Sequence, residues 1–279
     1  MKLFQNRKLL IVTMHNKQEV LAPILEKNLG VICDVSQVNT DDLGTFSGEI
    51  NRKGNGLETA REKCFLGKER SDADLILASE GSFGPHPTYF FSPANEETLM
   101  LIDTKYHVEW YATILSTDTN FNNRLCKNLE EVKDFCNQAL FPSHALIVRK
   151  DSTDFFDIKK GINTYERLEE LTVDYLKHYG QVYLETDMRA MCNPTRMKNI
   201  QKTAEKLVNQ LNQLCPQCQF PGFSIKETVS GLPCSECGFP TESIKELIYS
   251  CQRCNHRITT AYSSEKIYED PQYCQICNP

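Results

Sequence analysis

Four C-x-x-C pairs within the last 65 residues constrain the fold of this chain more than any other feature of its sequence. The pairs are separated by loops of 15, 13 and 19 residues, and they are Cys215/Cys218, Cys234/Cys237, Cys251/Cys254 and Cys274/Cys277. Two cysteines with this spacing in a tight turn direct both sulfurs at one point, so two such turns complete a tetrahedral site of four thiolates. The eight cysteines therefore predict two zinc ions in a C-terminal module.

An internal repeat of 19 residues underlies two of these pairs, because residues 215–227 match residues 234–246 at eight of thirteen positions. Each repeat begins with one cysteine turn, called a knuckle below. Two equivalent knuckles could face each other across one zinc, which would join the first pair to the second and the third to the fourth. An interleaved arrangement also fits, and the sequence leaves both open. Gly238, Asn255 and Asn278 follow three of the pairs, and these residue types tolerate the left-handed backbone that often ends a tight turn.

The metal expected in this module is structural zinc. Iron–sulfur clusters use the same ligand type with different spacings, and a redox C-x-x-C would accompany a βαβ pattern rather than occur four times. A site closed by four thiolates leaves no open coordination position for catalysis. Residues 211–279 carry five Lys/Arg against seven Asp/Glu, which is a poor balance for phosphate contacts. We therefore expect a folding element or a docking module for a protein or structured RNA.

Composition limits the function of the remaining chain. With 279 residues, 40% of them hydrophobic, the chain can bury one large core and carry a small module. A net charge of −6 gives no general attraction to nucleic acid or to anionic membranes. The first apolar run, residues 9–14, is too short for a signal peptide or a membrane span, so a cytoplasmic protein with reduced thiols is expected.

Apolar runs alternate with amphipathic segments through the first two hundred residues, which predicts an α/β domain with a mixed sheet flanked by helices. Strands are expected near residues 8–14, 31–36, 74–79, 98–103, 106–115, 144–149 and 181–185, and helices near 17–28, 57–70, 129–139 and 164–178. The runs on either side of Tyr106 are joined by a short turn, so these two strands should be antiparallel.

A further helix should begin where Asn193 suits the N-cap and Pro194 the first helical position. Its apolar stripe recurs every three or four residues as far as Leu214. The expected division is therefore an α/β ligand-binding or catalytic domain over residues 1–192, a connecting helix over 193–214, and a zinc-ribbon module over 215–279.

Polar side chains gather directly after three of the expected strands, where ligands collect in α/β folds. Thr13, His15 and Lys17 follow the first strand and open a helix, so they are candidates to hold a phosphate. Residues 79–87 are interpreted as a loop that presents Glu80 and His86, the latter as an acid–base candidate. The third such position is the single carboxylate that ends the strand near 98–103, which is Asp103.

The most site-like stretch runs from Glu185 to Arg196, between a strand and a helix N-terminus that favours anions. Its carboxylates, such as Asp187, could hold Mg²⁺, and its arginines could clamp a phosphate. The predicted ligand-binding residues here are Arg189, Asn193 and Arg196. Cys192 is a weaker candidate as a nucleophile, on the argument that the helix N-terminus would lower its pKa.

One more polar segment, residues 40–52, is too rich in glycine and polar side chains for a core element. It is interpreted as a functional loop or lid, and Glu49 within it is a candidate ligand-binding residue.

Several motifs together resemble a bacterial family of unknown function with a multi-cysteine tail. They are Thr13-Met14-His15, residues 44–49, residues 79–87, residues 185–190 and the cysteine pairs. The chain is also faintly similar to nucleoside triphosphate pyrophosphatases of the inosine-triphosphatase type, in the order of residues 13–17, 58–63 and 78–81. Here the lysine follows the threonine by four residues rather than five, and His15 stands where that family has asparagine.

These observations lead to two hypotheses of different classes. The first is a metal-dependent hydrolase of a phosphorylated or nucleotide-like small molecule, in which Glu80, Asp103 and Asp187 serve as Mg²⁺ ligands or bases. The second is a non-enzymatic protein that senses an anionic ligand, with a zinc ribbon that docks a protein or RNA.

Overall fold

The computed structural model describes residues 2–36 and 54–279, so the segment 40–52 and Glu49 lie outside the described residues. The chain forms two compact units, Met1–Leu207 and Val208–Pro279. Each unit is described by itself. Within the described ranges, no helix combines the length and the apolar character needed to cross a membrane.

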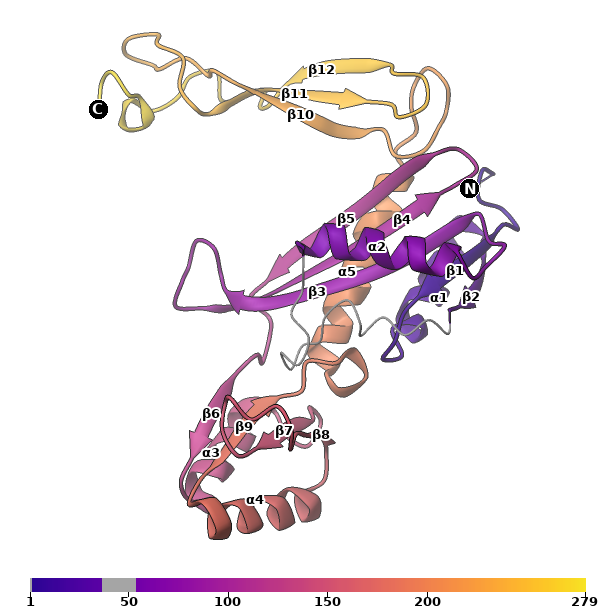
Figure 1. The fold of residues 1–279 in the computed structure, drawn as a ribbon. Helices are drawn as coiled ribbons and strands as arrows, with labels where there is room; N and C mark the ends of the chain where they lie inside the picture. Colours follow the sequence, from indigo (N-terminus) through magenta and orange to yellow (C-terminus); the bar gives the residue numbers. More distant parts are fainter. Residues whose placement is uncertain (1, 37–53) are drawn as a thin grey trace. The chain divides into compact units, whose positions relative to one another are not determined.

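The first unit contains a mixed five-stranded sheet in the order β2-β1-β3-β4-β5, which confirms the predicted sheet type (Figure 1). β1 is parallel to β2 and β3, whereas β4 and β5 are antiparallel to their neighbours. The strands are β1 (Lys8–Val12), β2 (Ile32–Val35), β3 (Leu75–Pro85), β4 (Pro93–Asp103) and β5 (Val108–Ser116).

Two helices connect the parallel strands, and both begin within two residues of the predicted positions. They are α1 (Gln18–Leu29) and α2 (Gly56–Lys68). α2 starts with a capping box, in which the Asn55 side chain accepts from the Glu58 N–H and the Glu58 side chain accepts from the Asn55 N–H. Ala60 and Cys64 of α2 pack with alternate residues of β1, β3 and β4, so this helix covers one face of the sheet.

The segment 79–87 is mostly strand, which corrects the prediction of a loop. β3 pairs with β4 along its whole length, from Leu75 opposite Asp103 to Pro85 opposite Pro93. Glycines and prolines are unfavourable inside a strand. Here the pairing with β4 holds the segment in an extended conformation despite them. At Gly81 the missing side chain has a packing role, because a Cβ there would lie 2.4 Å from an Nη atom of Arg196.

A second sheet forms within the same unit, although the sequence predicted only one. Its order is β6-β9-β7-β8, all antiparallel, with strands β6 (Asn123–Cys126), β7 (Leu146–Arg149), β8 (Lys159–Ile162) and β9 (Val182–Thr186). Helices α3 (Leu129–Ala139) and α4 (Tyr165–Tyr179) share its core, which includes Phe135 and Tyr175. The sequence did not predict β6 and β8, because each has only four residues of mixed polarity and shows no recognisable alternation of apolar and polar side chains.

Helix α5 (Pro194–Leu211) follows a short 3-10 turn, η2 (Ala190–Cys192), and begins where the sequence predicted. The Asn193 side chain accepts from the Arg196 N–H at 2.9 Å, as an N-cap does. Ile200, Ala204 and Leu207 are buried on one face. The helix ends three residues before the predicted Leu214, which is exposed.

The second unit is built on a three-stranded antiparallel sheet, in the order β10-β11-β12. Its elements are β10 (Ser224–Ser230), β11 (Ile244–Ser250), β12 (Arg257–Ala261) and the 3-10 turn η3 (Pro271–Tyr273). None of these strands was predicted, because most of their side chains are at least partly exposed and leave no clear apolar alternation.

Candidate anion site and metal centres

The eight cysteines of the second unit form two tetrads. Cys215, Cys218, Cys251 and Cys254 make one group, and Cys234, Cys237, Cys274 and Cys277 make the other. Sulfur pairs within these groups lie 3.6 to 3.9 Å apart. A tetrahedron with zinc–sulfur bonds of about 2.3 Å has sulfur–sulfur edges of about 3.8 Å. Each tetrad could therefore bind one zinc ion.

The tetrads are interleaved in sequence, and the sheet explains why. Each half of the internal repeat is a knuckle followed by a strand, β10 in the first and β11 in the second. Because these strands are antiparallel, Ser224 at the start of β10 lies opposite Ser250 at the end of β11. The first knuckle therefore meets the third, and the second meets the fourth at the other end of the sheet.

The turns that hold the cysteines have the expected conformation. A backbone N–H four residues after the first cysteine of each pair donates to that cysteine's carbonyl, at 2.8 to 3.1 Å. Gly238 and Asn255 adopt positive φ of 71° and 57°, as their residue types predicted, whereas Asn278 does not. In the first knuckle Gln219 takes this conformation, at 59°.

In the first unit, the carboxyl ends of β1 and β3 form a topological switch point. β1 lies between β2 and β3, so the chain leaves β1 for one side of the sheet and later crosses to the other. Ligands in open α/β sheets bind in the crevice at such a point. β1 ends opposite Ala78, so Ser79 and Glu80 of β3 extend beyond it, beside the segment that leads into α1.

The loop between β1 and α1 is strained and partly buried. His15 and Asn16 adopt left-handed φ of 68° and 60°, a conformation that non-glycine residues seldom take and that often marks functional sites. The Thr13 hydroxyl donates to the Met14 carbonyl at 2.8 Å. Burial, together with the nearby cations, chiefly Lys17, lowers the pKa of His15 to about 4, so its imidazole is neutral at pH 7.

Lys17 is a buried ammonium group, with 5% of its surface exposed. Its Nζ lies 2.8 Å from the Ser79 hydroxyl, and no carboxylate of the described residues forms an ion pair with it. Burial is the main cause that lowers its pKa to about 7. Lys17 also occupies the N-cap of α1, which has no side-chain cap. A buried cation and a helix N-terminus therefore meet at one place, and both favour an anion.

Three acids around this position already have cationic partners. Glu80 lies 2.5 Å from Lys63 of α2, and both side chains are largely buried. Glu97 of β4 pairs with Gly81, the residue after Glu80. Because neighbouring residues of a strand point to opposite faces, Glu97 lies on the face away from α2, where Arg196 donates to it at 2.6 Å.

Asp187 is the third of these acids. It is fully buried, and it accepts from Arg189 at 2.6 Å and from the Gly161 N–H at 3.0 Å. Arg189 itself retains some exposure, with 23% of its side chain accessible.

Two of the predicted ligand-binding residues have internal roles. Arg196 is 1% exposed, and its guanidinium donates to the Met188 carbonyl at 2.5 Å as well as to Glu97. It therefore connects α5 to β4 and to the loop that follows β9. The Asn193 amide caps α5 and donates to Asn120 at 2.8 Å. Both groups therefore have internal partners that account for their burial, and their role in binding a ligand stays a prediction.

Asp103 does not join the crevice, which corrects its prediction as a catalytic residue. It lies opposite Leu75 at the other end of β3, five residues from the partner of Glu80, or about 16 Å along the strand. There it accepts a bidentate pair of hydrogen bonds from Arg7, at 2.7 and 2.8 Å. It also accepts from two backbone N–H groups of the following turn. Its role is to fix the strand ends.

His86 is also remote from Glu80, six residues further toward the hairpin tip, or about 20 Å along an extended strand. Its Nδ1 accepts from the N–H groups of Thr88 and Tyr89, at 3.1 Å each. The ring stacks on Tyr89. The imidazole therefore shapes a turn, and its predicted acid–base role is not supported by its position.

Cys192 does not have an activated thiol. Burial, followed by the charge of Asp187, raises its pKa to about 11, opposite to the expected effect of the helix N-terminus. Among the described residues, only the cysteine tetrads bring together three or more side chains able to hold a metal ion. A cage of Glu80, Asp103 and Asp187 for Mg²⁺ is therefore absent from the part of the chain described.

Sequence reasoning did not single out Lys63, Glu96 and Glu97, which the structure places beside the candidate residues. Glu96 shares the α2 face with Glu80, and a Cβ at Gly56 would lie 3.8 Å from a Glu96 oxygen and 4.0 Å from the Glu80 Cγ. The predicted strand began at residue 98, whereas β4 begins at Pro93. Had residues 93–97 been recognised as strand, the alternation of side chains would have assigned Glu96 and Glu97 to opposite faces of the sheet.

Comparison with known proteins gives a family without an assigned activity. No curated protein matches the chain. The family model that matches covers residues 63–279, which includes β3, β4, α5 and both cysteine tetrads but neither β1 nor α1. The chain therefore belongs to the DUF6671 family, described as a domain of unknown function.

Proposed function

We propose that the first unit binds a phosphorylated small molecule in the crevice beyond β1 and β3, and hydrolyses it with the help of a divalent cation. The observation that carries this proposal is Lys17. The other cations named in this crevice each have a carboxylate partner, whereas in the described part of the chain Lys17 is bonded to the Ser79 hydroxyl alone. A buried charge without a counter-ion is costly, and a phosphate group would supply the counter-ion.

The neighbouring groups fit this role. The first turn of α1 offers backbone N–H groups and the positive end of the helix dipole to the same anion. His15 is neutral at pH 7 because its pKa is lowered to about 4, so it can exchange hydrogen bonds with a phosphate oxygen without adding charge. Arg189 retains accessible surface and lies close enough to affect His15 electrostatically.

A divalent cation would have to be held in part by the substrate. Mg²⁺ commonly binds through one or two carboxylates together with phosphate oxygens, and needs no cage made of protein alone. Glu80 and Glu96 share the face of β3 and β4 opposite that of Ser79, and Glu80 lies close enough to Lys17 to influence its pKa, so these carboxylates are suited to this. When bound, such an ion would neutralise charge that develops on the phosphate. Lys63, paired with Glu80, would hold that carboxylate in place.

The second unit is proposed to have a structural role. Four thiolates fill the coordination sphere of each zinc, so neither site offers a position for substrate. The module could dock a protein or RNA, and its eight cysteines would then keep that surface folded.

The test compares Lys17→Met with Lys202→Met, which replaces an exposed lysine of α5. Both purified proteins are incubated with Mg²⁺ or Mn²⁺ and a panel of nucleotides and sugar phosphates, and released phosphate and pyrophosphate are measured beside binding by calorimetry. We expect the wild type and Lys202→Met to act on at least one compound, and Lys17→Met to lose at least tenfold in binding.

A Glu80→Gln variant separates the two parts of the proposal. We expect it to lose turnover and keep anion binding. If the wild type and the variants bind a compound saturably but none of them turns it over, the hydrolase hypothesis is rejected and the anion-sensing alternative is favoured. Equal binding by wild type and Lys17→Met would reject the crevice as the site.

A further inference from the structure

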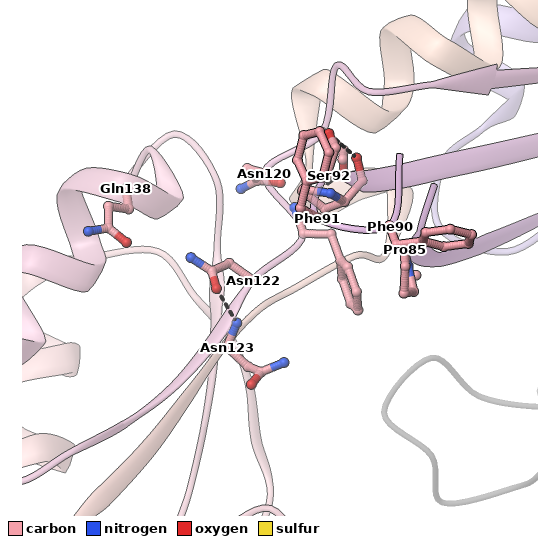
Figure 2. Close-up of a pocket in the computed structure, with 12 residues that line it drawn as sticks. Pro85, Phe90, Phe91, Ser92, Asn120, Asn122, Asn123 and Gln138 are labelled. Atoms are coloured by element: carbon pink, nitrogen blue, oxygen red, sulfur yellow. Dashed lines mark hydrogen bonds between the residues drawn. The ribbon is translucent and has the colours of Figure 1, made fainter. Parts of the chain in front are cut away.

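A cavity of about 490 Å³ lies in the first unit, between the tip of the β3–β4 hairpin and the segment that leads into β6 (Figure 2). It begins at Gly84, five residues beyond Ser79 on β3, or about 17 Å along the strand. This cavity is therefore a separate place from the anion crevice. Its volume is within the range of small-molecule pockets.

The tip of the hairpin holds two phenylalanines in water. Phe90 and Phe91 are 77% and 91% exposed, and adjacent exposed apolar side chains of this size often mark a binding surface. The turn that carries them is held by hydrogen bonds. The His86 Nδ1 accepts from two backbone N–H groups of the turn, and the His86 N–H donates to the Ser92 carbonyl at 2.8 Å. Both rings therefore stand on a hydrogen-bonded turn.

The opposite wall is the segment that leads into β6, and it is tied to the rest of the unit. The Asn120 amide donates to the Ala139 carbonyl at 2.7 Å and accepts from Asn193 at 2.8 Å. The Asn122 N–H donates to the Thr186 hydroxyl at 3.1 Å. Both walls are therefore built from contacts within the protein, as in a preformed ligand pocket.

Two side-chain amides at the cavity are oriented by the groups that donate to them. The Asn122 Oδ1 accepts from the Asn123 N–H at 2.9 Å, and the Gln138 Oε1 accepts from Arg124 at 2.9 Å. Because a backbone N–H and a guanidinium can only donate, these contacts fix which end of each amide is the oxygen. Among the described residues, neither amide nitrogen has an acceptor. The cavity therefore offers N–H donors to a ligand.

The lining of the cavity carries no charge. None of the twelve described residues that line it has an ionisable side chain. Charged residues make up 24% of the chain, so a lining of this size would ordinarily contain about three. An uncharged lining supplies no counter-ion for a phosphate or a carboxylate, and burying such a group unpaired is costly. The ligand that fits is therefore neutral, accepts hydrogen bonds and has an apolar face for the phenylalanines.

We propose that this cavity binds the ring of a neutral sugar, either free or at the end of a glycan. The hydroxyl and ring oxygens of a pyranose accept from side-chain amides, and its C–H groups form an apolar face that packs on an aromatic ring. A nucleic-acid strand would bring phosphates that this lining cannot neutralise. The inference does not rest on the function proposed for the crevice.

The test is a titration of the full-length protein followed by saturation-transfer NMR. The ligands are glucose, galactose, mannose and N-acetylglucosamine, together with their methyl glycosides, which imitate the end of a glycan. Adenosine and uridine are titrated in parallel, because they are neutral and carry a flat base. We expect at least one sugar or glycoside to bind saturably and more tightly than either nucleoside. Sulfate, which would occupy the crevice, should not displace it.

The variants are Phe90→Ala and Phe91→Ala, with Phe156→Ala as a matched control at a fully exposed phenylalanine that does not line the cavity. We expect each of the first two to weaken sugar binding by about threefold to tenfold, the scale of one aromatic contact. Exposed residues of this kind can be replaced without a cost in folding. Gln138→Glu keeps the bond from Arg124, removes the amide donors and should also weaken binding.

The outcomes decide the site and the class of ligand separately. If no sugar binds, or if binding survives both phenylalanine variants or falls equally in Phe156→Ala, the cavity is not a sugar site and the inference is rejected. If a nucleoside binds more tightly than every sugar and depends on the same phenylalanines, the cavity receives a base and the sugar assignment is wrong. Displacement by sulfate would place the sugar in the crevice, which rejects this inference and leaves the proposed function standing.

Discussion

The two units hold their charged and metal-binding groups by different means. In the second unit each cysteine pair lies within one turn of four residues, and the antiparallel sheet brings two such turns together at each end. In the first unit the charged groups of the crevice come from separate elements far apart in the chain, and most of them are neutralised within the protein. Lys63–Glu80, Arg189–Asp187 and Arg196–Glu97 are such pairs.

This difference determines what each unit needs in order to fold. Besides its cysteines, the second unit buries few apolar side chains, namely Val208, Leu211, Phe220, Phe223 and Leu232, so we expect metal binding to supply much of its stability. The first unit has two apolar clusters of its own, and its ion pairs are complete without a ligand. Its crevice can therefore be formed before any ligand binds, with Lys17 as the exception.

The largest expected effect is the loss of zinc. Cys215→Ser should remove one of two zinc ions per chain and unfold its end of the second unit, because structural zinc contributes apparent binding energies of about 10–16 kcal/mol. Metal analysis measures the stoichiometry, and hydrogen exchange reports which unit loses protection. Cys33→Ser, at a cysteine of the first unit, is the control and should retain two zinc ions.

A result of one zinc ion in the wild-type protein would contradict the paired tetrads. Loss of protection in the first unit as well as the second would show that the two units do not fold independently.

The next largest effect concerns the buried pair of Arg196 and Glu97. Arg196→Met should lower the free energy of unfolding by about 3–5 kcal/mol, because it leaves the Glu97 carboxylate buried and unpaired. The double variant with Glu97→Gln should recover part of this loss. Chemical denaturation followed by tryptophan fluorescence measures both, since Trp110 is buried in the first unit. A loss below about 1 kcal/mol would show that the pair is not a structural tie.

The two sites differed in how much of them could be predicted from sequence. Ligand identity in the cysteine tetrads follows from local spacing, since a C-x-x-C turn aims both sulfurs regardless of the remaining fold. The pairing of the turns depends on strand direction, and β10 and β11 were not predicted. Consequently the interleaved arrangement remained one of two alternatives until the sheet was known.

The crevice was only partly predictable, for a related reason. Thr13, Lys17 and Glu80 were found because they follow apolar strands, and strand ends can be recognised locally. Asp103 satisfied the same rule, yet it lies at the opposite end of the sheet because its strand runs antiparallel to β3. Arg196 was predicted to face a ligand, and only the tertiary contact with Glu97 shows that it is an internal partner.

A smaller effect, of opposite sign to that at Arg196, is expected at Lys17. Lys17→Met should leave the protein at least as stable as the wild type, since replacing a buried charge by an apolar side chain removes its desolvation cost. The same variant should lose anion binding. Chemical denaturation and calorimetry measure the two effects. Strong destabilisation would instead indicate that Lys17 is a structural residue with an internal partner, and the anion site would have to be abandoned.

The smallest predicted effect is a pH dependence of anion binding. Burial lowers the pKa of Lys17 from 10.5 to about 7, so its ammonium form is depleted as the pH rises through 7. Sulfate is a suitable probe because its own charge is constant over this range. Its affinity should fall by about eightfold between pH 6.5 and 8, as expected for a cation with this pKa.

The sign of the corresponding stability effect is fixed by the same shift. The unfolded chain binds more protons than the folded chain between pH 7 and 10.5, so the cost of burying Lys17 is present below pH 7 and decreases above it. Lys17→Met should flatten both profiles, whereas Lys202→Met should leave them unchanged. A sulfate affinity that is constant from pH 6.5 to 8 in the wild type would mean that a different cation receives the anion, with Arg189 as the accessible alternative.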